Sequence, residues 1–421
     1  MEQHSTKVLK LRVQSSFSQY FLKLKGFSKS EKKALKDMVF GLLVSKSIFI
    51  NQIAAILQEK IKLKDVAKRL SKQYLKDDFW KKATESHLCA VSGSVGSSDY
   101  IIWDGTDISK PNAKHLEGLE FVRNGDTKET NLGYNVLNIN AVSPDKDILP
   151  LYSKAYSFKM GAQSEANEIK EAANFLSKHI NHLSMWVLDR GADSSILKSF
   201  FIKNIAQFII RLKKSTKLTY KGEDIRVDKL LSKVKFAYKQ EVIKVKKNKR
   251  VKRIYEIGIL EVSQTVDREA VKLHLVVTRN NKGGVAYFLV KSIKETIEDI
   301  VKQAFKGYGL RWSIEEYHRH IKQEYKLEAI QMRTFTGLQS MLAVITIAMS
   351  MIYYQIKSIH IKLLLDTGLN LLNKNRFEEL INFFYYKISK IISFILTGAK
   401  VRHTVDYEPP RLSMPSLFGN N

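Results

Sequence analysis

Apolar residues repeat at helical spacing near both ends of the chain and form short strand-like runs in between. The segment from Ser28 to Leu75 is helical in pattern, with Ser28 and Ser30 as capping residues before its first apolar run. From Ser97 onward, short apolar runs alternate with helical patterns. The predicted strands are Tyr100–Trp103, Asn131–Ser143, Asp147–Ser157, Met185–Asp189 and Gln207–Leu212, and the predicted helices are Ser164–His179 and Ser194–Lys203.

The order of these elements is three strands followed by alternating helices and strands, which predicts an α/β fold with a mixed sheet. In such a sheet the first and fourth strands can lie side by side, and they end in Asp104 and Asp189. Ligands of open α/β sheets bind at the carboxyl ends of the strands. We therefore expect the two aspartates to converge at one edge. The order is similar to that of the ribonuclease-H-like fold, in which paired acids hold metal ions.

Residues 213–290 interrupt this alternation and predict a β-rich basic insertion. Hairpin turns are expected around Asn248 and at Asn281–Gly284. Basic residues crowd the first turn, and Phe236, Tyr238 and Tyr255 are interleaved with them. Such a charge run is either a solvated edge that prevents aggregation or a surface for nucleic acid. The charge of the whole chain favours the second interpretation.

Helical periodicity returns after the insertion. Apolar residues spaced by four, three and four predict a buried helix stripe: Leu310, Ile314, Tyr317 and Ile321. Polar residues spaced by three, four and seven share a neighbouring face: Tyr308, Arg311, Glu315 and Lys322. A pair such as Arg311 and Glu315 is also typical of an exposed helix, which it stabilises by a few tenths of a kcal/mol. The combined spacing, after two strand-ending aspartates, favours a site.

The longest apolar run, Met341–Tyr354, predicts a buried core helix and not a membrane span. A span needs about 20 apolar residues, and Gln339 and Lys357 flank this run closely. Two further apolar helices are expected at Ile361–Leu372 and Phe377–Leu396, where they pack either a partner or their own domain. The tail from Val401 is expected to be irregular.

Composition narrows the class of protein. The 421 residues contain 70 Lys and Arg against 42 Asp and Glu, a net charge of +28, and 44% hydrophobic residues. The apolar fraction is ample for a core, and the positive excess predicts a polyanionic partner, with nucleic acid the default. Cys89 is the single cysteine, so no intrachain disulfide can form. The first residues lack the apolar run of a secretory signal, and we expect a reducing, cytosolic compartment.

The sequence lacks the motifs of HExxH zinc enzymes and of Walker-type nucleotide-binding proteins. The ten His are scattered without HExxH spacing, and there is no Walker-type glycine loop. We therefore expect neither a zinc site nor dependence on nucleoside triphosphates. The lysine-rich helical segment near the N-terminus is either a DNA-binding module resembling helix-turn-helix or a helical cap on the next domain.

At these motifs the chain resembles the bacterial insertion-sequence transposases of the DDE type that carry a Tyr-Arg-Glu-Lys signature, insertion-sequence family four. Tyr308, Arg311, Glu315 and Lys322 fit the signature without a gap. The segment LDRGAD, 188–193, is similar to that around the family's second Asp, and WDGTDIS, 103–109, to that around the first. Asp107 competes with Asp104 for the role of first aspartate, and Asp104 is preferred because it ends the strand. The resemblance runs from Tyr100 to about Gln355.

The resemblance implies a ribonuclease-H-like catalytic core and cut-and-paste DNA transposition. Asp104, Asp189 and Glu315 would be the catalytic residues and would hold two Mg²⁺ ions, or Mn²⁺ in their place, about 4 Å apart. DNA contacts are implied for Tyr308, Arg311, Lys322, Arg190 and Arg211. Tyr287 matches an aromatic residue on which a flipped base stacks in the family, where a relative has Trp; packing inside the insertion is the alternative.

The expected organisation follows from these elements. It comprises an N-terminal helical region as the candidate for binding DNA ends (1–96), the first part of the catalytic core (97–212), the insertion (213–290), the second part of the core with the Glu helix (291–365) and a C-terminal helical region as the candidate for dimerisation (366–421). The implied partners are double-stranded DNA and a second copy of the chain, in the bacterial cytoplasm near the nucleoid. Two alternatives remain, a catalytically inactive DNA-binding derivative and a structure-specific nuclease without strand transfer.

Overall fold

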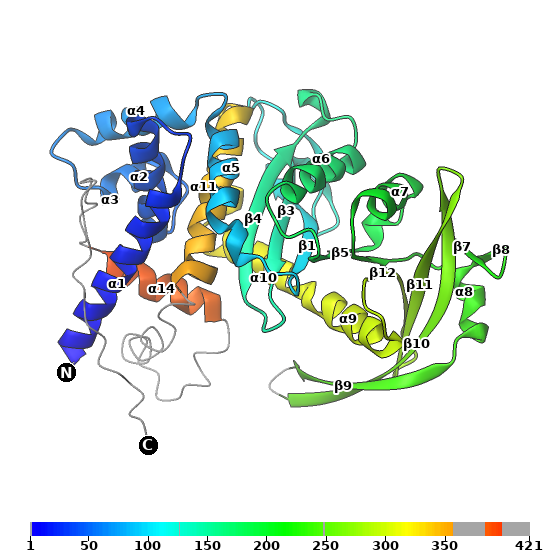
Figure 1. The fold of residues 1–421 in the computed structure, drawn as a ribbon. Coiled ribbons are helices and arrows are strands. Elements are labelled where there is room, and N and C mark those ends of the chain that lie inside the picture. The colour runs from blue at the N-terminus through cyan, green and yellow to red at the C-terminus, as the bar shows by residue number, and fades with distance from the viewer. Residues whose placement is uncertain (1, 126, 247–248, 357–383, 398–421) are drawn as a thin grey trace, which may run out of the picture.

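The computed structural model describes residues 2–125, 127–246, 249–356 and 384–397 (Figure 1). The helix expected at Ile361–Leu372, the tip of the hairpin around Asn248 and the tail from Val401 lie outside these residues. The N-terminal region consists of helices α1 to α5, and a long 12-stranded sheet follows it in the chain. The basic insertion lies at the end of the molecule far from the N-terminal helices (Figure 1).

Five helices form the N-terminal region, and the predicted capping residue starts one of them. Ser28 caps α2 and forms a capping box with Glu31, so the free amides at the start of the helix are satisfied. The predicted helical segment, Ser28 to Leu75, is divided into three helices, α2, α3 and α4. The helices are α1 (Glu2–Lys23), α2 (Lys29–Ser45), α3 (Ile50–Ile56), α4 (Leu63–Tyr74) and α5 (Phe79–Val91).

The core strands appear close to where the sequence predicts them, with one extra edge strand. β3 and β4 form a hairpin, and β1 pairs with β5 in parallel, as predicted for the first and fourth strands. The strand order is β2-β3-β1-β5-β6, with β4 also paired to β3. The bounds are β1 (Tyr100–Ser109), β2 (Glu120–Arg123), β3 (Thr130–Val142), β4 (Ile148–Tyr156), β5 (Met185–Leu188) and β6 (Phe208–Arg211).

Helices cover both faces of these core strands. Phe201 of α7 (Ser195–Asn204) packs its ring against Trp186 and Phe208 on one face. The other face meets α9 (Ile297–Leu310), where Gly307 comes so close that a Cβ there would lie 2.5 Å from the Tyr100 ring. Any side chain at residue 307 would therefore push α9 off the sheet. α6 (Glu165–Ser177) begins where the sequence predicts it, and the Ser164 side chain caps it by accepting a hydrogen bond from the amide of Asn167.

The insertion does not form a separate sheet, because β12 pairs with β6 and continues the core sheet as β6-β12-β11-β10-β7-β8. The predicted hairpin at Asn281–Gly284 joins β11 to β12. The elements are β7 (Lys217–Tyr220), β8 (Glu223–Arg226), α8 (Val227–Leu230), β9 (Phe236–Lys246), β10 (Lys249–Val266), β11 (Glu269–Asn280) and β12 (Val285–Lys291).

The longest apolar helix is α11 (Phe335–Ser350), which continues as a π-helical turn at Met351–Ile356. It packs against β4, α2 and α5, and 89% of its most apolar stretch is buried inside the protein. This agrees with the predicted core helix. The structure places part of the second predicted C-terminal helix as α14 (Phe384–Leu396), which packs against α1 and α2.

Candidate active site

Strand pairing brings the two predicted aspartates together. Ile102 of β1 pairs with Val187 of β5, and Asp104 and Asp189 each follow two residues later. Since alternate residues of a strand point to the same face, both side chains leave the sheet on the face covered by α9. Asp104 does not end its strand, however. β1 continues to Ser109 because it still pairs with β3 after the parallel partner β5 has ended.

Asp189 is held by the turn that follows β5. Its Oδ1 accepts a hydrogen bond of 2.7 Å from the amide of Gly191. A Cβ at residue 191 would lie 2.9 Å from that oxygen, so the glycine of the LDRGAD segment allows this close approach. The acid at the end of the segment, Asp193, has a different role. It is buried and binds Lys198 and the amide of Lys213 at 2.7 and 2.6 Å, which fixes the turn.

Two helices, not one, carry the four spaced polar residues. α9 ends at Leu310 and α10 (Trp312–Gln323) begins after Arg311, although Arg311 itself keeps helical dihedral angles and the two helices run nearly in line (Figure 1). The predicted apolar stripe on this segment is buried: Leu310, Ile314, Tyr317 and Ile321 are between 0% and 6% exposed. The polar stripe therefore faces the sheet edge.

Arg311 joins two of the predicted carboxylates. Its Nη1 lies 3.1 Å from Asp104 Oδ2, and its Nη2 contacts Glu315 Oε1. The exposed fractions of the three side chains are 17% for Arg311, 19% for Asp104 and 28% for Glu315. The Arg311–Glu315 pair expected on an exposed helix is thus present, but it is turned towards the sheet and shared with Asp104.

Burial and the neighbouring charges act together on the pKa of Asp104. Burial raises the pKa of Asp104 to about 7, the Arg311 guanidinium opposes the rise, and the negative charges of Asp189 and Glu315 add to it. Like charges and desolvation both disfavour a carboxylate, whereas a neighbouring cation favours it. Arg311 alone therefore does not supply enough positive charge to keep Asp104 ionised at neutral pH.

Sequence reasoning missed a fourth carboxylate at this edge. Glu165, the first residue of α6, has Oε1 3.7 Å from the position that a Cβ on Gly105 would take. Burial raises the pKa of Glu165, the charge of Asp189 adds to the rise, and a hydrogen bond with Tyr156 opposes it. In the sequence, Glu165 looks like an ordinary acidic residue in the first turn of a helix. Only the fold reveals that it lies beside Asp104 and Asp189.

Tyr308 and Arg211 contact each other beside these acids. Arg211 Nη1 lies 3.1 Å from the Tyr308 hydroxyl oxygen, and the guanidinium also lies over the Tyr308 ring at 5.6 Å. The Phe288 ring packs on Tyr308 from the insertion side, with centroids 4.5 Å apart. Arg190 is exposed in the turn after β5. Tyr287 is only 4% exposed in β12, which favours packing inside the insertion over stacking on a base.

Lys322 and Asp107 form a separate ion pair further along β1. Lys322 Nζ lies 3.3 Å from Asp107 Oδ1 and 3.1 Å from Glu328 Oε1. Asp107 also accepts hydrogen bonds from Asn124 and from the amide of Gly125. Because Asp104, not Asp107, shares Arg311 with Glu315, the geometry favours Asp104 as the first acid of the group.

A buried histidine fixes α10 against the sheet. His318, one helix turn after Glu315, is 8% exposed, and its Nε2 lies 3.1 Å from Nδ2 of Asn138. Asn138 pairs with Asp104 across β1 and β3. Burial, together with the positive charges of Lys322 and Arg311, lowers the pKa of His318 to about 3. The neutral imidazole therefore links the helix that carries Glu315 to the strand neighbour of Asp104.

Trp312 is 56% exposed at the start of α10, directly after Arg311. An exposed indole beside basic residues is a surface on which a nucleic-acid base can stack. The apolar residues around it on the helix are buried, so its exposure is a property of its position at the junction of the two helices.

The donor chemistry of the site fits divalent cations of the Mg²⁺ type. Carboxylate oxygens are the ligands these ions prefer, and the raised pKa of Asp104 reflects a shortage of positive charge that a cation would relieve. Within the residues that the structure describes, no three His, Cys, Asp or Glu side chains are grouped closely enough to hold a metal as they stand. The guanidinium of Arg311 lies between Asp104 and Glu315 instead.

Comparison with known proteins identifies one family. The model of the transposase DDE domain matches residues 99–351, from the start of β1 to the end of α11. No curated protein sequence matches the chain. The match includes every acid and base of the candidate site and the whole insertion.

Proposed function

Because the chain belongs to the transposase DDE domain family, we propose that it is a cut-and-paste transposase with its active site at Asp104, Asp189 and Glu315. Transposase function and a ribonuclease-H-like core follow from the family and the mixed sheet. The finer assignment rests on one observation. The carboxylates of Asp104 in β1, Asp189 directly after β5 and Glu315 in α10 interact electrostatically, and Arg311 contacts the first and the third.

In the proposed reaction, water attacks the phosphodiester at the end of the element, and the freed 3′-hydroxyl then attacks target DNA. Asp104, Asp189 and Glu315 would hold two Mg²⁺ ions, with Mn²⁺ as a substitute. When bound, such a pair activates the attacking oxygen and stabilises the leaving oxygen. The contribution of the chain is to place acids from three separate elements at one edge and to hold α10 there through His318 and Asn138.

Basic and aromatic residues around the acids would bind the DNA. We propose that Arg311 and Lys322 bind phosphates, Arg311 by a bidentate fork and Lys322 as a point charge. Arg211 supports Tyr308, which donates to phosphate or stacks on a base, and exposed Arg190 contacts the backbone. These roles, with the spacing from Tyr308 to Lys322, support membership of insertion-sequence family four. Tyr287 would need to be uncovered before a base could stack on it.

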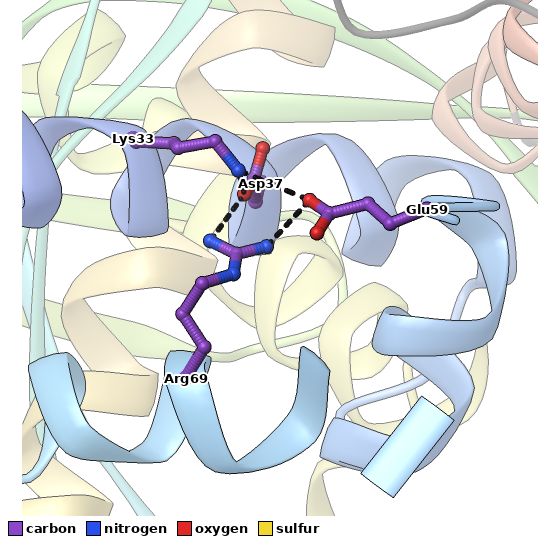
Figure 2. Close-up of polar contacts among 4 residues, drawn as sticks. All are labelled: Lys33, Asp37, Glu59 and Arg69. Atoms are coloured by element: carbon purple, nitrogen blue, oxygen red, sulfur yellow. Dashed lines mark hydrogen bonds and ion pairs between the residues drawn. The ribbon is translucent and has the colours of Figure 1, made fainter. Parts of the chain in front are cut away.

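The N-terminal region, 1–96, is proposed to bind the ends of the element through α4. Three lysines spaced by four residues, Lys64, Lys68 and Lys72, are exposed along one side of this helix. Arg69 points inward instead, as Figure 2 shows, to Asp37 of α2 at 2.9 Å and to Glu59 at 2.6 Å. A helix docked in this way presents its lysines at fixed spacing to a phosphate backbone.

The remaining organisation is proposed from the same elements. The two parts of the core, 97–212 and 291–365, enclose the basic insertion, 213–290, which lies beside the active site and would extend the DNA surface. Joining two ends requires two active sites, and we propose a homodimer in the DNA complex. The C-terminal region, 366–421, is a candidate for that contact, with Phe394 of α14 exposed. The proposed location is the bacterial cytoplasm, at the nucleoid.

The test is Mg²⁺-dependent cleavage and joining of a labelled DNA that carries the flanking ends of the element. Glu315→Gln is compared with Glu316→Gln, its exposed neighbour on the same helix. We expect both reactions to disappear in the first variant and to persist in the second. Cutting without joining would indicate a nuclease, and binding without either reaction an inactive DNA-binding derivative. Equal activity of both variants would refute the assigned site.

A further inference from the structure

Asp107 is a buried acid that the proposed reaction does not use. Its side chain is 7% exposed, and three donors surround it. Lys322 Nζ lies 3.3 Å from Oδ1, the amide of Gly125 donates to the same oxygen at 3.2 Å, and Asn124 Nδ2 donates to Oδ2 at 3.3 Å. Two of these donors come from the loop between β2 and β3, so the carboxylate ties this loop to α10.

Glu328, the second partner of Lys322, is much more exposed than Asp107. Glu328 contacts the ammonium at 3.1 Å, but its side chain is 44% exposed, whereas that of Lys322 is 15% exposed. An exposed ion pair contributes little and is easily exchanged, whereas removing one partner of a buried pair leaves an uncompensated charge. A phosphate that approaches Lys322 can therefore replace Glu328, but it cannot readily replace Asp107.

We propose that Asp107 is a positioning residue. It holds the ammonium group of the flexible Lys322 side chain at the edge of the active site, ready for a DNA phosphate, and the phosphate displaces Glu328 from this ammonium. The inference rests on the proposed function, because Lys322 is assigned to DNA there. A lysine side chain has many rotamers, and fixing it before DNA arrives removes part of the entropy cost of binding. Asp107 thereby acts on DNA through Lys322.

A double-mutant cycle of Asp107→Asn and Lys322→Met tests the coupling. Each single variant is expected to lower kcat/KM for end cleavage by about tenfold, typical of a supporting residue, and the double variant is expected to be no worse than Lys322→Met. Asp107→Asn should keep its Mn²⁺ affinity in titration calorimetry. Glu328→Gln should tighten binding of end DNA, and Glu316→Gln is the control for the change in charge.

Two results would overturn the proposal. Asp107→Asn could lose Mn²⁺ binding and all cleavage, as we expect for Asp104→Asn, or the two single effects could multiply in the double variant. If the wild-type protein does not cleave, the proposed function fails. Thermal unfolding of the metal-free variants still tests the Asp107–Lys322 pair, because the changes in unfolding midpoint of two coupled residues do not add in the double variant. If Asp107→Asn alone does not fold, the double variant should fold, and its failure to do so would contradict the pairing.

Discussion

The buried carboxyl of Asp104 predicts that the metal-free protein loses stability as the pH rises. The pKa of Asp104 is raised from 3.8 to about 7, mainly by burial. Below pH 4 this carboxyl is protonated in both the folded and the unfolded chain. Between about pH 4 and pH 7 the unfolded chain releases the proton and the folded protein keeps it, so the free energy of unfolding falls. Above about pH 8 the carboxyl is ionised in both states and the loss is complete.

The magnitude follows from the size of the shift. A rise of about 3 pKa units, at about 1.4 kcal/mol per unit, gives a loss of about 4 kcal/mol between pH 4 and pH 8. Asp104→Asn has no proton to lose at this position. Relative to the wild type, the variant should therefore gain up to about 4 kcal/mol over the same range, while losing cleavage activity.

The assay is chemical denaturation of both proteins in EDTA at steps from pH 4 to pH 8, with Asp77→Asn, an exposed acid, as the matched control. A bound divalent cation competes with the proton, and ligand binding to the folded state adds stability. Mg²⁺ should thus stabilise the wild type more at pH 8 than at pH 5 and should have little effect on Asp104→Asn. Parallel stability curves for the two proteins in EDTA would refute the reasoning.

Three other substitutions test the contacts around the acids. Arg311→Ala removes the cation shared by Asp104 and Glu315, and we expect weaker binding of cleaved ends; unchanged binding in a gel-shift titration would contradict its role. His318→Leu should lower stability by about 1–3 kcal/mol in thermal unfolding, because Asn138 stays buried without its partner, and should leave the salt dependence of DNA binding unchanged, because the histidine is neutral. Arg69→Met removes the ion pairs that dock α4 and should therefore lower the unfolding midpoint and weaken end binding. The Mn²⁺ affinity of this variant, measured by calorimetry, should stay constant.

Much of the core could be predicted because local patterns and strand pairing act together there. The spacing of Leu310, Ile314, Tyr317 and Ile321 marked the buried face correctly, and Ser164 marked a helix start. Pairing of β1 with β5 was expected from element order alone. The end of β1 was misjudged, because an apolar run ends at Trp103 while the backbone continues to hydrogen-bond to β3 as far as Ser109.

Other features depend on tertiary contacts that no local pattern records. The insertion carries ordinary hairpin signals, and nothing in them indicates that β12 joins β6 and extends the core sheet. Trp312 has a large apolar side chain of the kind that usually packs in a core, but its position at the junction of α9 and α10 leaves it exposed. Glu165 looks like an ordinary acid in the first turn of a helix, and only the fold shows that α6 brings it near Asp189. In each case the deciding neighbour lies on an element distant in the sequence.

The role of Arg311 shows how the two levels of information differ. Its spacing from Glu315 predicts an ion pair one helix turn apart, which on a surface would contribute a few tenths of a kcal/mol. The fold adds Asp104 at 3.1 Å and removes most of the solvent, so the same arginine becomes the counter-charge for acids on two elements. Burial also makes that counter-charge insufficient, since the pKa of Asp104 stays near 7. A site with one fixed cation and a surplus of acids is suited to accept further positive charge, which is the property that metal-dependent phosphodiester chemistry requires.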